Sequence, residues 1–331
     1  MRCPRRRVPR SLKPAGGRRL LSPPGIGDGV YDNGQFGDGL NAPEHPKHGT
    51  GQLKFTLIYP NQPGFCDPDL AASVAEAAEQ AGFETLLVWD HYSVPWGADT
   101  VDAWAFLAYA AARTSRIKLG TCVTPIPFRP PAQLAKIVST VDLLSKGRAI
   151  LGVGAGWHQP EFEGYSQWDS DRVRVAKTIE GIELIRRLWT EDSVDHSGTH
   201  YTAKGAVLEP KPVSKPHPPM WFGVRGPRML RLAAEYGDAW IPTMITPEEY
   251  AEGKKTLAEL RTAMGKPPDM YCGLQVFDPP QTAGDALKDI EAFASAGCDE
   301  YGVVWSYPPD EATDRIDWFA REVMGPAQAS G

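Results

Sequence analysis

The sequence predicts an α/β fold in which eight βα units close into a (β/α)8 TIM barrel, with insertions after the fourth strand and before the fifth. Three observations predict it. The chain has 331 residues, of which 42% are hydrophobic, so it can bury a sizeable core. From Leu53 onward, short apolar or β-branched runs alternate with longer segments of helical period, which is typical of a parallel sheet. Eight such units follow one another, and eight close a barrel more naturally than they fill an open sheet.

Each unit pairs one predicted strand with one predicted helix. The strands are expected at Lys54–Tyr59, Thr85–Trp89, Lys118–Thr124, Ala149–Val153, Met220–Gly223, Ala239–Pro242, Tyr271–Phe277 and Glu300–Trp305. The helices are expected at Asp69–Ala81, Asp102–Thr114, Pro131–Leu144, Asp171–Trp189, Arg228–Tyr236, Pro247–Met264, Ala283–Ala296 and Thr313–Val323.

Two connections are longer than the others. Gly156–Ser170 follows the fourth strand, and Thr190–Pro219 precedes the fifth and ends in a proline-rich run. The second connection predicts a short hairpin followed by an extended lead into the strand. Long loops at the carboxyl ends of barrel strands usually build the active site.

The ends of the chain are set apart by composition. Residues 1–52 are predicted to form a tail, because they are basic and then rich in glycine and proline with almost no apolar periodicity. The barrel is expected over residues 53–325, with a second tail at 326–331. The basic start is interpreted either as an arm for an anionic partner or as a solvated extension, and composition favours the extension. Arginines interrupt the apolar stretch that a signal peptide needs.

Charge and cysteine usage exclude several classes of protein. The first twenty residues hold eight of the 35 basic side chains and no acid, so the remainder has 27 basic against 41 acidic side chains, which does not suit a nucleic-acid partner. No apolar run reaches the roughly 20 residues of a membrane span. The five cysteines are scattered and never form a C-x-x-C pair, which predicts a cytoplasmic protein and argues against a metal site.

Titratable side chains end the second predicted strand, where Asp90 and His91 follow an apolar run. The carboxyl end of a barrel strand places them at the mouth, and the reference pKa of histidine, about 6.5, suits proton exchange near neutral pH. We therefore predict His91 as catalytic, with Asp90 orienting it or binding a cofactor. Being adjacent, the two cannot both face inward from a regular strand. The alternative is a strand-ending aspartate that caps the next segment beside an ordinary histidine.

Two glycine-bearing turns are candidates for ligand contacts. The fourth strand leads into Gly154-Ala155-Gly156-Trp157, where glycines allow close backbone approach to a ligand, although Trp157 breaks the dinucleotide-binding pattern. The fifth leads into Gly223-Val224-Arg225-Gly226 before Pro227, so a helix start with free amides and two nearby arginines, Arg225 and Arg228, forms a possible phosphate site. A plain loop and a solvated cap are the alternatives. Trp96 and Trp157 are either rim packing or walls for a flat ring.

Taken together, several segments resemble the luciferase-like monooxygenase superfamily, and more closely its branch of oxidoreductases dependent on coenzyme F420. They are Ala81–His91, Leu119–Thr124, Leu134–Lys136 with Asp142–Arg148, Leu151–Trp157 with Glu161-Phe162, and Trp221–Gly223 with Gly237–Trp240. The likeness covers nearly all of Leu53 to Val323.

The resemblance implies a ring system over the barrel mouth, a cis peptide bond at Cys122–Val123 beneath it, and a homodimer. The implied cofactor-binding residues are Asp90, Cys122, Val123, Thr124, Gly154, Ala155, Gly156, Trp157, Gly223, Val224, Arg225 and Gly226. Two departures from the family stand out. Val224 replaces a second glycine, and Trp157 stands where the glucose-6-phosphate dehydrogenases of this family have a catalytic glutamate, which argues against sugar-phosphate oxidation.

The leading hypothesis is hydride transfer between F420 and a small organic substrate, with His91 handling the proton. One alternative is an FMN-dependent monooxygenase that uses reduced flavin and oxygen. Another is a barrel that binds a flavin-like ligand without turnover, as a carrier or accessory subunit.

Overall fold

The computed structural model describes residues 52–278 and 280–329, so the predicted tail of residues 1–52 lies almost entirely outside the described part of the chain. Among the described residues, none of the helices combines the length and the apolar character needed to span a membrane. The rest of the predicted architecture can be followed strand by strand.

The sheet is a closed parallel barrel. Its strands are β1 (Lys54–Tyr59), β2 (Thr85–Val88), β3 (Lys118–Thr121), β4 (Thr124–Pro125), β5 (Ala149–Gly154), β8 (Met220–Phe222), β9 (Ala239–Trp240), β10 (Tyr271–Val276) and β11 (Glu300–Val304). They are ordered β3-β2-β1-β11-β10-β9-β8-β5-β4, and a further pairing of β3 with β5 closes the ring. This confirms the predicted fold.

One predicted strand is divided. The sequence predicts a single strand over Lys118–Thr124, whereas the structure ends β3 at Thr121 and begins β4 at Thr124. The two residues between them, Cys122 and Val123, are joined by a cis peptide bond, as the resemblance implies. β3 and β4 therefore occupy one position in the barrel, and β4 continues the pairing with β5.

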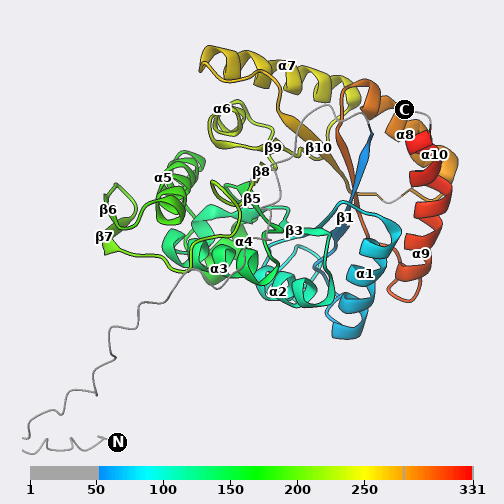
Figure 1. Cartoon of the computed structure of the whole chain (residues 1–331), viewed down its shortest axis with the longest axis horizontal. Coiled ribbons are helices and arrows are strands. Elements are labelled where there is room, and N and C mark those ends of the chain that lie inside the picture. Colours follow the sequence, from blue (N-terminus) through cyan, green and yellow to red (C-terminus); the bar gives the residue numbers. More distant parts are fainter. Residues whose placement is uncertain (1–51, 279, 330–331) are drawn as a thin grey trace, which may run out of the picture. The chain divides into compact units, whose positions relative to one another are not determined.

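The helices lie outside the strands (Figure 1). They are α1 (Pro68–Ala81), α2 (Ala103–Arg113), α3 (Pro131–Leu144), α4 (Gln159–Tyr165), α5 (Asp171–Thr190), α6 (Pro227–Tyr236), α7 (Pro247–Ala263), α8 (Ala283–Ser295) and α9 (Ala312–Phe319). A 3-10 turn at Ile126–Phe128 precedes α3, while a π-helical turn at Ala320–Met324 and then α10 (Gly325–Ala329) follow α9. Residues 326–329, expected to begin the C-terminal tail, are thus helical.

Local sequence accounts for several helix starts. Asp67 accepts a hydrogen bond from the Leu70 amide at 2.8 Å, and Asp102 accepts one from the Ala105 amide at 2.8 Å. At α7 a reciprocal capping box joins Thr246 and Glu249. Each of these caps satisfies backbone donors that have no partner in the first turn, which is why the helix begins there.

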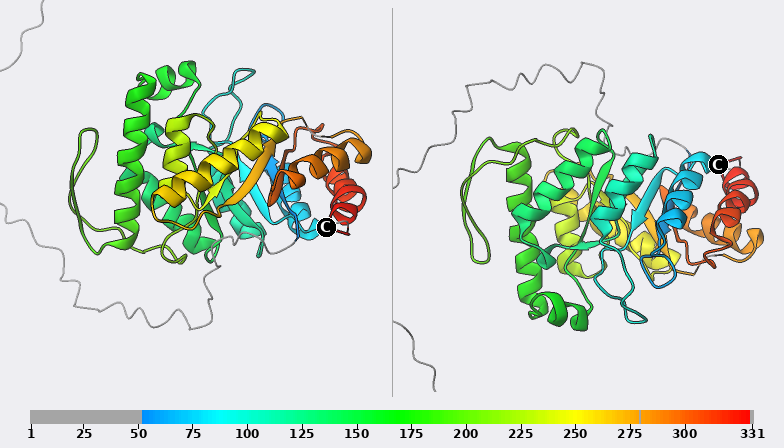
Figure 2. Two further views of the ribbon diagram at one scale, coloured as in Figure 1. Left: turned by 90° about the horizontal axis from the view of Figure 1, so that it is seen from above. Right: turned by 90° about the horizontal axis from the view of Figure 1, so that it is seen from below.

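Both predicted insertions are present. The first contains α4, and the second contains an antiparallel hairpin of β6 (Val194–Ser197) and β7 (Thr202–Ala206), confirming the expected hairpin. Figure 2 shows this hairpin extending beyond α5, away from the barrel strands. Glu180 on α5 holds the hairpin turn by accepting hydrogen bonds from the amides of His200 (3.0 Å) and Tyr201 (2.6 Å).

Apolar side chains fill both faces of the sheet. The larger cluster lies between strands and helices, and a smaller one, which includes Ile58, Leu87, Trp221 and Ile241, fills the barrel interior. Because both faces of the sheet are buried, the strand sequences are largely continuous apolar runs without alternating polar residues. The interior cluster reaches Trp89, Cys122 and Val123, so the packed core ends directly beneath the mouth of the barrel.

Candidate active site

The carboxyl ends of the strands bring the predicted turns together around Val123. Because neighbouring strands are parallel, their carboxyl ends share one end of the barrel. A Cβ placed on Gly154 would lie 2.5 Å from Cγ2 of Val123, and one placed on Gly223 would lie 2.6 Å from its Cγ1. The Val123 side chain therefore packs directly against the backbones of Gly154 and Gly223. Only glycine allows this close approach, because any other residue would place its Cβ against Val123.

This contact predicts the effect of a simple substitution. Gly154→Ala forces a methyl group against Val123, and we expect it to lower the free energy of unfolding by about 1–3 kcal/mol. Adding Val123→Ala in the same chain removes the opposing methyl groups and should restore part of the loss. Denaturant unfolding measures both.

The matched control for this substitution is Gly164→Ala, because no other atom lies within 4 Å of a Cβ placed there. Equal stability of the Gly154→Ala and Gly164→Ala proteins would contradict the close approach.

Cys122 anchors the cis peptide segment from inside the barrel. Its Sγ donates to Oε1 of Gln275 at 2.7 Å, and Nε2 of Gln275 donates to the carbonyl of Ile241 at 2.5 Å. Burial raises the pKa of the Cys122 thiol well above its usual value, so the sulfur remains protonated and can donate. Cys122 thus ties the segment to β10 and β9 and is not a reactive thiolate. Gln275, which the sequence analysis did not single out, completes this anchor.

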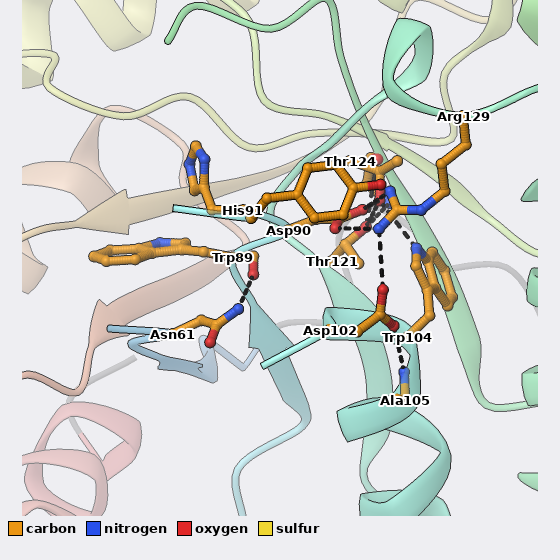
Figure 3. A network of polar contacts seen from close by, with 12 residues as sticks. Asn61, Trp89, Asp90, His91, Asp102, Trp104, Ala105, Thr121, Thr124 and Arg129 are labelled. Atoms are coloured by element: carbon orange, nitrogen blue, oxygen red, sulfur yellow. Dashed lines mark hydrogen bonds and ion pairs between the residues drawn. The ribbon is translucent and has the colours of Figure 1, made fainter. Parts of the chain in front are cut away.

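Asp90 belongs to a buried ionic network (Figure 3). Its two carboxylate oxygens accept hydrogen bonds from Nη1 and Nη2 of Arg129 at 2.7 and 2.8 Å, and Oδ2 also accepts one from Oγ1 of Thr124 at 2.7 Å. Although burial by itself lowers the pKa of Arg129, the Asp90 carboxylate raises it above its ordinary value. Thr124 is the residue after Val123, the second residue of the cis peptide bond. This network therefore holds the chain on the carboxyl side of that bond, as Cys122 holds it on the amino side.

Of the two roles considered for Asp90, the structure does not support orientation of His91. Figure 3 shows the two side chains leaving the end of β2 in different directions, as their adjacency requires. The carboxylate bonded to the imidazole belongs instead to Glu161 on α4, whose Oε2 lies 2.9 Å from Nδ1 of His91. Glu161 was noticed in the sequence only within the resembling segment Glu161-Phe162. The sequence feature that could have identified it is that this carboxylate lies on the long insertion after the fourth strand.

Glu161 is held rigidly in its position. It is 1% exposed, and its Oε1 accepts hydrogen bonds from the backbone amides of Tyr92 and, at 3.2 Å, Ser93. A carboxylate only accepts, so Nδ1 of His91 carries the hydrogen in this pair and Nε2 is left as the second ring nitrogen. The indole of Trp157 contacts the imidazole edge to face, with ring centroids 5.8 Å apart. His91 is thereby oriented from two sides.

The two predicted ligand turns have distinct geometries. Gly156 adopts a positive φ of 82°, which favours glycine, and it is followed by the exposed Trp157. Gly226 is the N-cap of α6 and has no side-chain cap, so the first amides of this helix are not satisfied by a capping side chain. Beside it, Nη1 of Arg225 donates to the carbonyl of Met244 at 2.6 Å, joining the β8 and β9 loops.

Comparison with known proteins identifies one family and several relatives. The family model described as luciferase-like monooxygenase matches residues 48–306. The chain is 37% identical over 182 residues to the F420-dependent glucose-6-phosphate dehydrogenase of Nocardia farcinica, covering 53% of each protein. It is 32% identical over 223 residues to the phthiodiolone/phenolphthiodiolone dimycocerosates ketoreductase of Mycobacterium kansasii, covering 60% of each. The matches thus span between half and three fifths of these curated relatives.

Solved structures show the same fold. A structure of an F420-dependent secondary alcohol dehydrogenase in complex with an F420-acetone adduct superposes with a TM-score of 0.71 at 24% identity, covering 83% of this chain and 99% of that one. The oxygenating constituent of 3,6-diketocamphane monooxygenase from Pseudomonas putida, in complex with FMN, gives a TM-score of 0.70 at 15% identity, covering 83% and 98%. At these identities the likeness concerns the fold alone.

Proposed function

Since the chain belongs to the luciferase-like monooxygenase family, we propose that it is an F420-dependent oxidoreductase that transfers a hydride between the deazaflavin and a small organic substrate. The named relatives that depend on F420 support this proposal. The observation that carries it is the arrangement at the barrel mouth, where Val123 lies between Gly154 and Gly223 and where an imidazole oriented by Glu161 follows the neighbouring strand β2.

The residues present fit a flat ring with a phosphate-bearing chain. Because positions 154 and 223 are glycines, the Val123 side chain packs into the space that their side chains would fill. In this proposal the small residues of the Cys122–Thr124 segment then face the ring. In this proposal Cys122, Val123 and Thr124 support the ring, while the turn Gly154–Trp157 and the turn Gly223–Gly226 hold the chain. The uncapped start of α6 and Arg225 are suited to its phosphate. Asp90 contributes by fixing Thr124.

The protein's own part in the reaction is to orient the substrate and to handle one proton. When bound, the deazaflavin supplies the acceptor or donor for the hydride. As an alcohol carbon gives up its hydride, the hydroxyl proton passes to Nε2 of His91. In the reverse direction Nε2 returns a proton to the carbonyl oxygen. Glu161 keeps Nδ1 occupied, so that Nε2 is the nitrogen available for exchange, and it stabilises the imidazolium that forms.

Titration with F420 and with FMN tests this proposal. We expect F420 to bind at least about tenfold more tightly than FMN, a difference of about 1.4 kcal/mol, and to turn over without oxygen consumption. Arg225→Ala should weaken F420 binding, because it removes a cation beside the start of α6. Ligand fluorescence and an oxygen electrode give the two measurements.

The control for the titration is Arg116→Ala, an exposed arginine just before β3, at the opposite end of the barrel. Tighter binding of FMN together with oxygen uptake would establish the monooxygenase alternative. Binding of F420 or FMN without turnover would establish the remaining alternative, a barrel that binds the ligand as a carrier or accessory subunit.

The proposal also includes a homodimer in the cytoplasm. The family resemblance supports the dimer, and the free Cys66, Cys122, Cys272 and Cys298 fit a reducing compartment. Sedimentation of the purified protein measures the oligomeric state.

A further inference from the structure

Exposed apolar side chains gather on the loops that follow the barrel strands. Of the eight large hydrophobic side chains that are exposed in the described part of the chain, five lie on loops or short elements beyond β2, β5, β9 and β10. They are Trp96 (56% exposed), Trp157 (62%), Tyr165 (61%), Met244 (72%) and Phe277 (38%). Isolated exposed hydrophobic residues are ordinary, whereas a cluster at one end of a barrel marks a binding surface.

Three of these rings are continuous with the candidate active site. Phe277 stacks on Trp89, which ends the packed interior, with centroids 5.4 Å apart and planes inclined by 22°. Trp96 meets the same indole edge to face at 6.2 Å. On the other side, Trp157 contacts His91. We call Trp96, Trp157 and Phe277 the aromatic rim. Trp157 thus contacts the proton-handling imidazole, while Trp96 and Phe277 contact Trp89, two residues before it in the chain.

Positive charge is scarce in these loops. The segments that follow the eight strands, at 60–67, 89–102, 122–130, 155–170, 223–226, 241–246, 277–282 and 305–311, contain no lysine and two arginines. Arg129 is buried against Asp90, and Arg225 bonds to the Met244 carbonyl beside the proposed cofactor phosphate. Asp99 and Asp278, both exposed, lie near the rim residues in sequence. A substrate phosphate would therefore find no uncommitted cation within these segments and would meet negative charge. Two exposed arginines lie just beyond them, Arg172 in the first turn of α5 and Arg228 in the first turn of α6, where Arg228 is close in sequence to the proposed cofactor phosphate.

We propose that the substrate is an uncharged organic molecule with an apolar, ring-sized body that packs on the aromatic rim, and not a phosphorylated sugar. This inference rests on the proposed hydride transfer and specifies its substrate. Burial of an apolar body against Trp96 and Phe277 supplies the binding energy, and the Nε2 side of His91 receives the one polar group that reacts. The loops that carry the aromatic rim, at 89–102, 155–170 and 277–282, contain no lysine or arginine to pair with a phosphate.

Binding to the F420-loaded protein tests the proposal, measured by titration calorimetry with 1-phenylethanol, acetophenone and glucose 6-phosphate as probes. We expect the two neutral aromatic probes to bind at least tenfold more tightly than the sugar phosphate. Trp96→Ala and Phe277→Ala should each weaken the aromatic probes about tenfold while leaving F420 affinity unchanged. The matched control is Tyr109→Ala, because Tyr109 is an exposed aromatic residue on α2, away from the rim.

Several results would overturn the inference. They are tighter binding of glucose 6-phosphate, failure of every probe to bind, or rim variants that behave like Tyr109→Ala. Rim variants that change the oligomeric state instead would identify the rim as a contact between two copies of the chain. The F420 titration separates these outcomes from failure of the proposed function, because a protein that binds no F420 fails before any substrate probe is added.

Discussion

Replacing His91 with alanine is expected to lower kcat by about 10²–10⁴-fold while leaving the affinity for F420 nearly unchanged. The imidazole is the titratable group that Glu161 and Trp157 orient at the barrel mouth, and its removal leaves the alcohol proton without an acceptor. Steady-state kinetics with a substrate found by the probe titrations measures kcat, and F420 titration measures cofactor binding. Undiminished kcat in the His91→Ala protein would remove this residue from the mechanism.

The chain contains a matched control for this experiment. His196 also pairs with a glutamate, through an Nε2–Oε1 distance of 3.3 Å to Glu180, but this pair joins the β6–β7 hairpin to α5. His196→Ala should leave kcat unchanged. If both alanine variants lost activity equally, the loss would reflect stability and not proton transfer.

Glu161→Gln tests how His91 is oriented. The amide oxygen can still accept from the Tyr92 and Ser93 amides, but the amide nitrogen then faces Nδ1 and donates to it. The hydrogen of the imidazole is displaced to Nε2, the atom that must accept the substrate proton. We expect at least a tenfold loss of kcat in alcohol oxidation with little change in KM. A change confined to KM would contradict this role.

Removing the buried guanidinium by Arg129→Met is expected to destabilise the fold by about 3–5 kcal/mol, because it leaves the Asp90 carboxylate uncompensated in the interior. The pair is bidentate, and both side chains are buried. Denaturant unfolding measures the loss. The double variant Asp90→Asn, Arg129→Met should recover part of it, since no ionised group then remains buried without a partner.

An exposed bidentate pair provides the comparison. Arg187 and Glu191 on the surface of α5 also form two hydrogen bonds, of 2.7 and 2.8 Å, but their side chains are 37% and 41% exposed. Water screens such a pair, so Arg187→Met should destabilise the fold far less than Arg129→Met. Equal losses for the two methionine variants would show that the Asp90 network does not anchor the barrel mouth.

Local sequence was enough to predict the barrel. Alternating strand and helix periods give eight units, and caps such as Asp67, Asp102 and the Thr246 capping box set helix starts within a residue or two. These features depend on residues a few positions apart. The position of the cis peptide bond at Cys122–Val123 came from the resemblance and not from periodicity, which predicted one unbroken strand.

The partners in the site were decided only by the tertiary structure. His91 and Glu161 are 70 positions apart, Asp90 and Arg129 are 39 apart, and Cys122 and Gln275 are 153 apart. Sequence reasoning placed Asp90 and His91 at the mouth and left open whether Asp90 orients His91 or binds a cofactor, because it could not identify Arg129 and Glu161 as their partners. Closing the barrel brings loops from distant units to one rim, and which side chains then meet depends on the direction in which each leaves its strand.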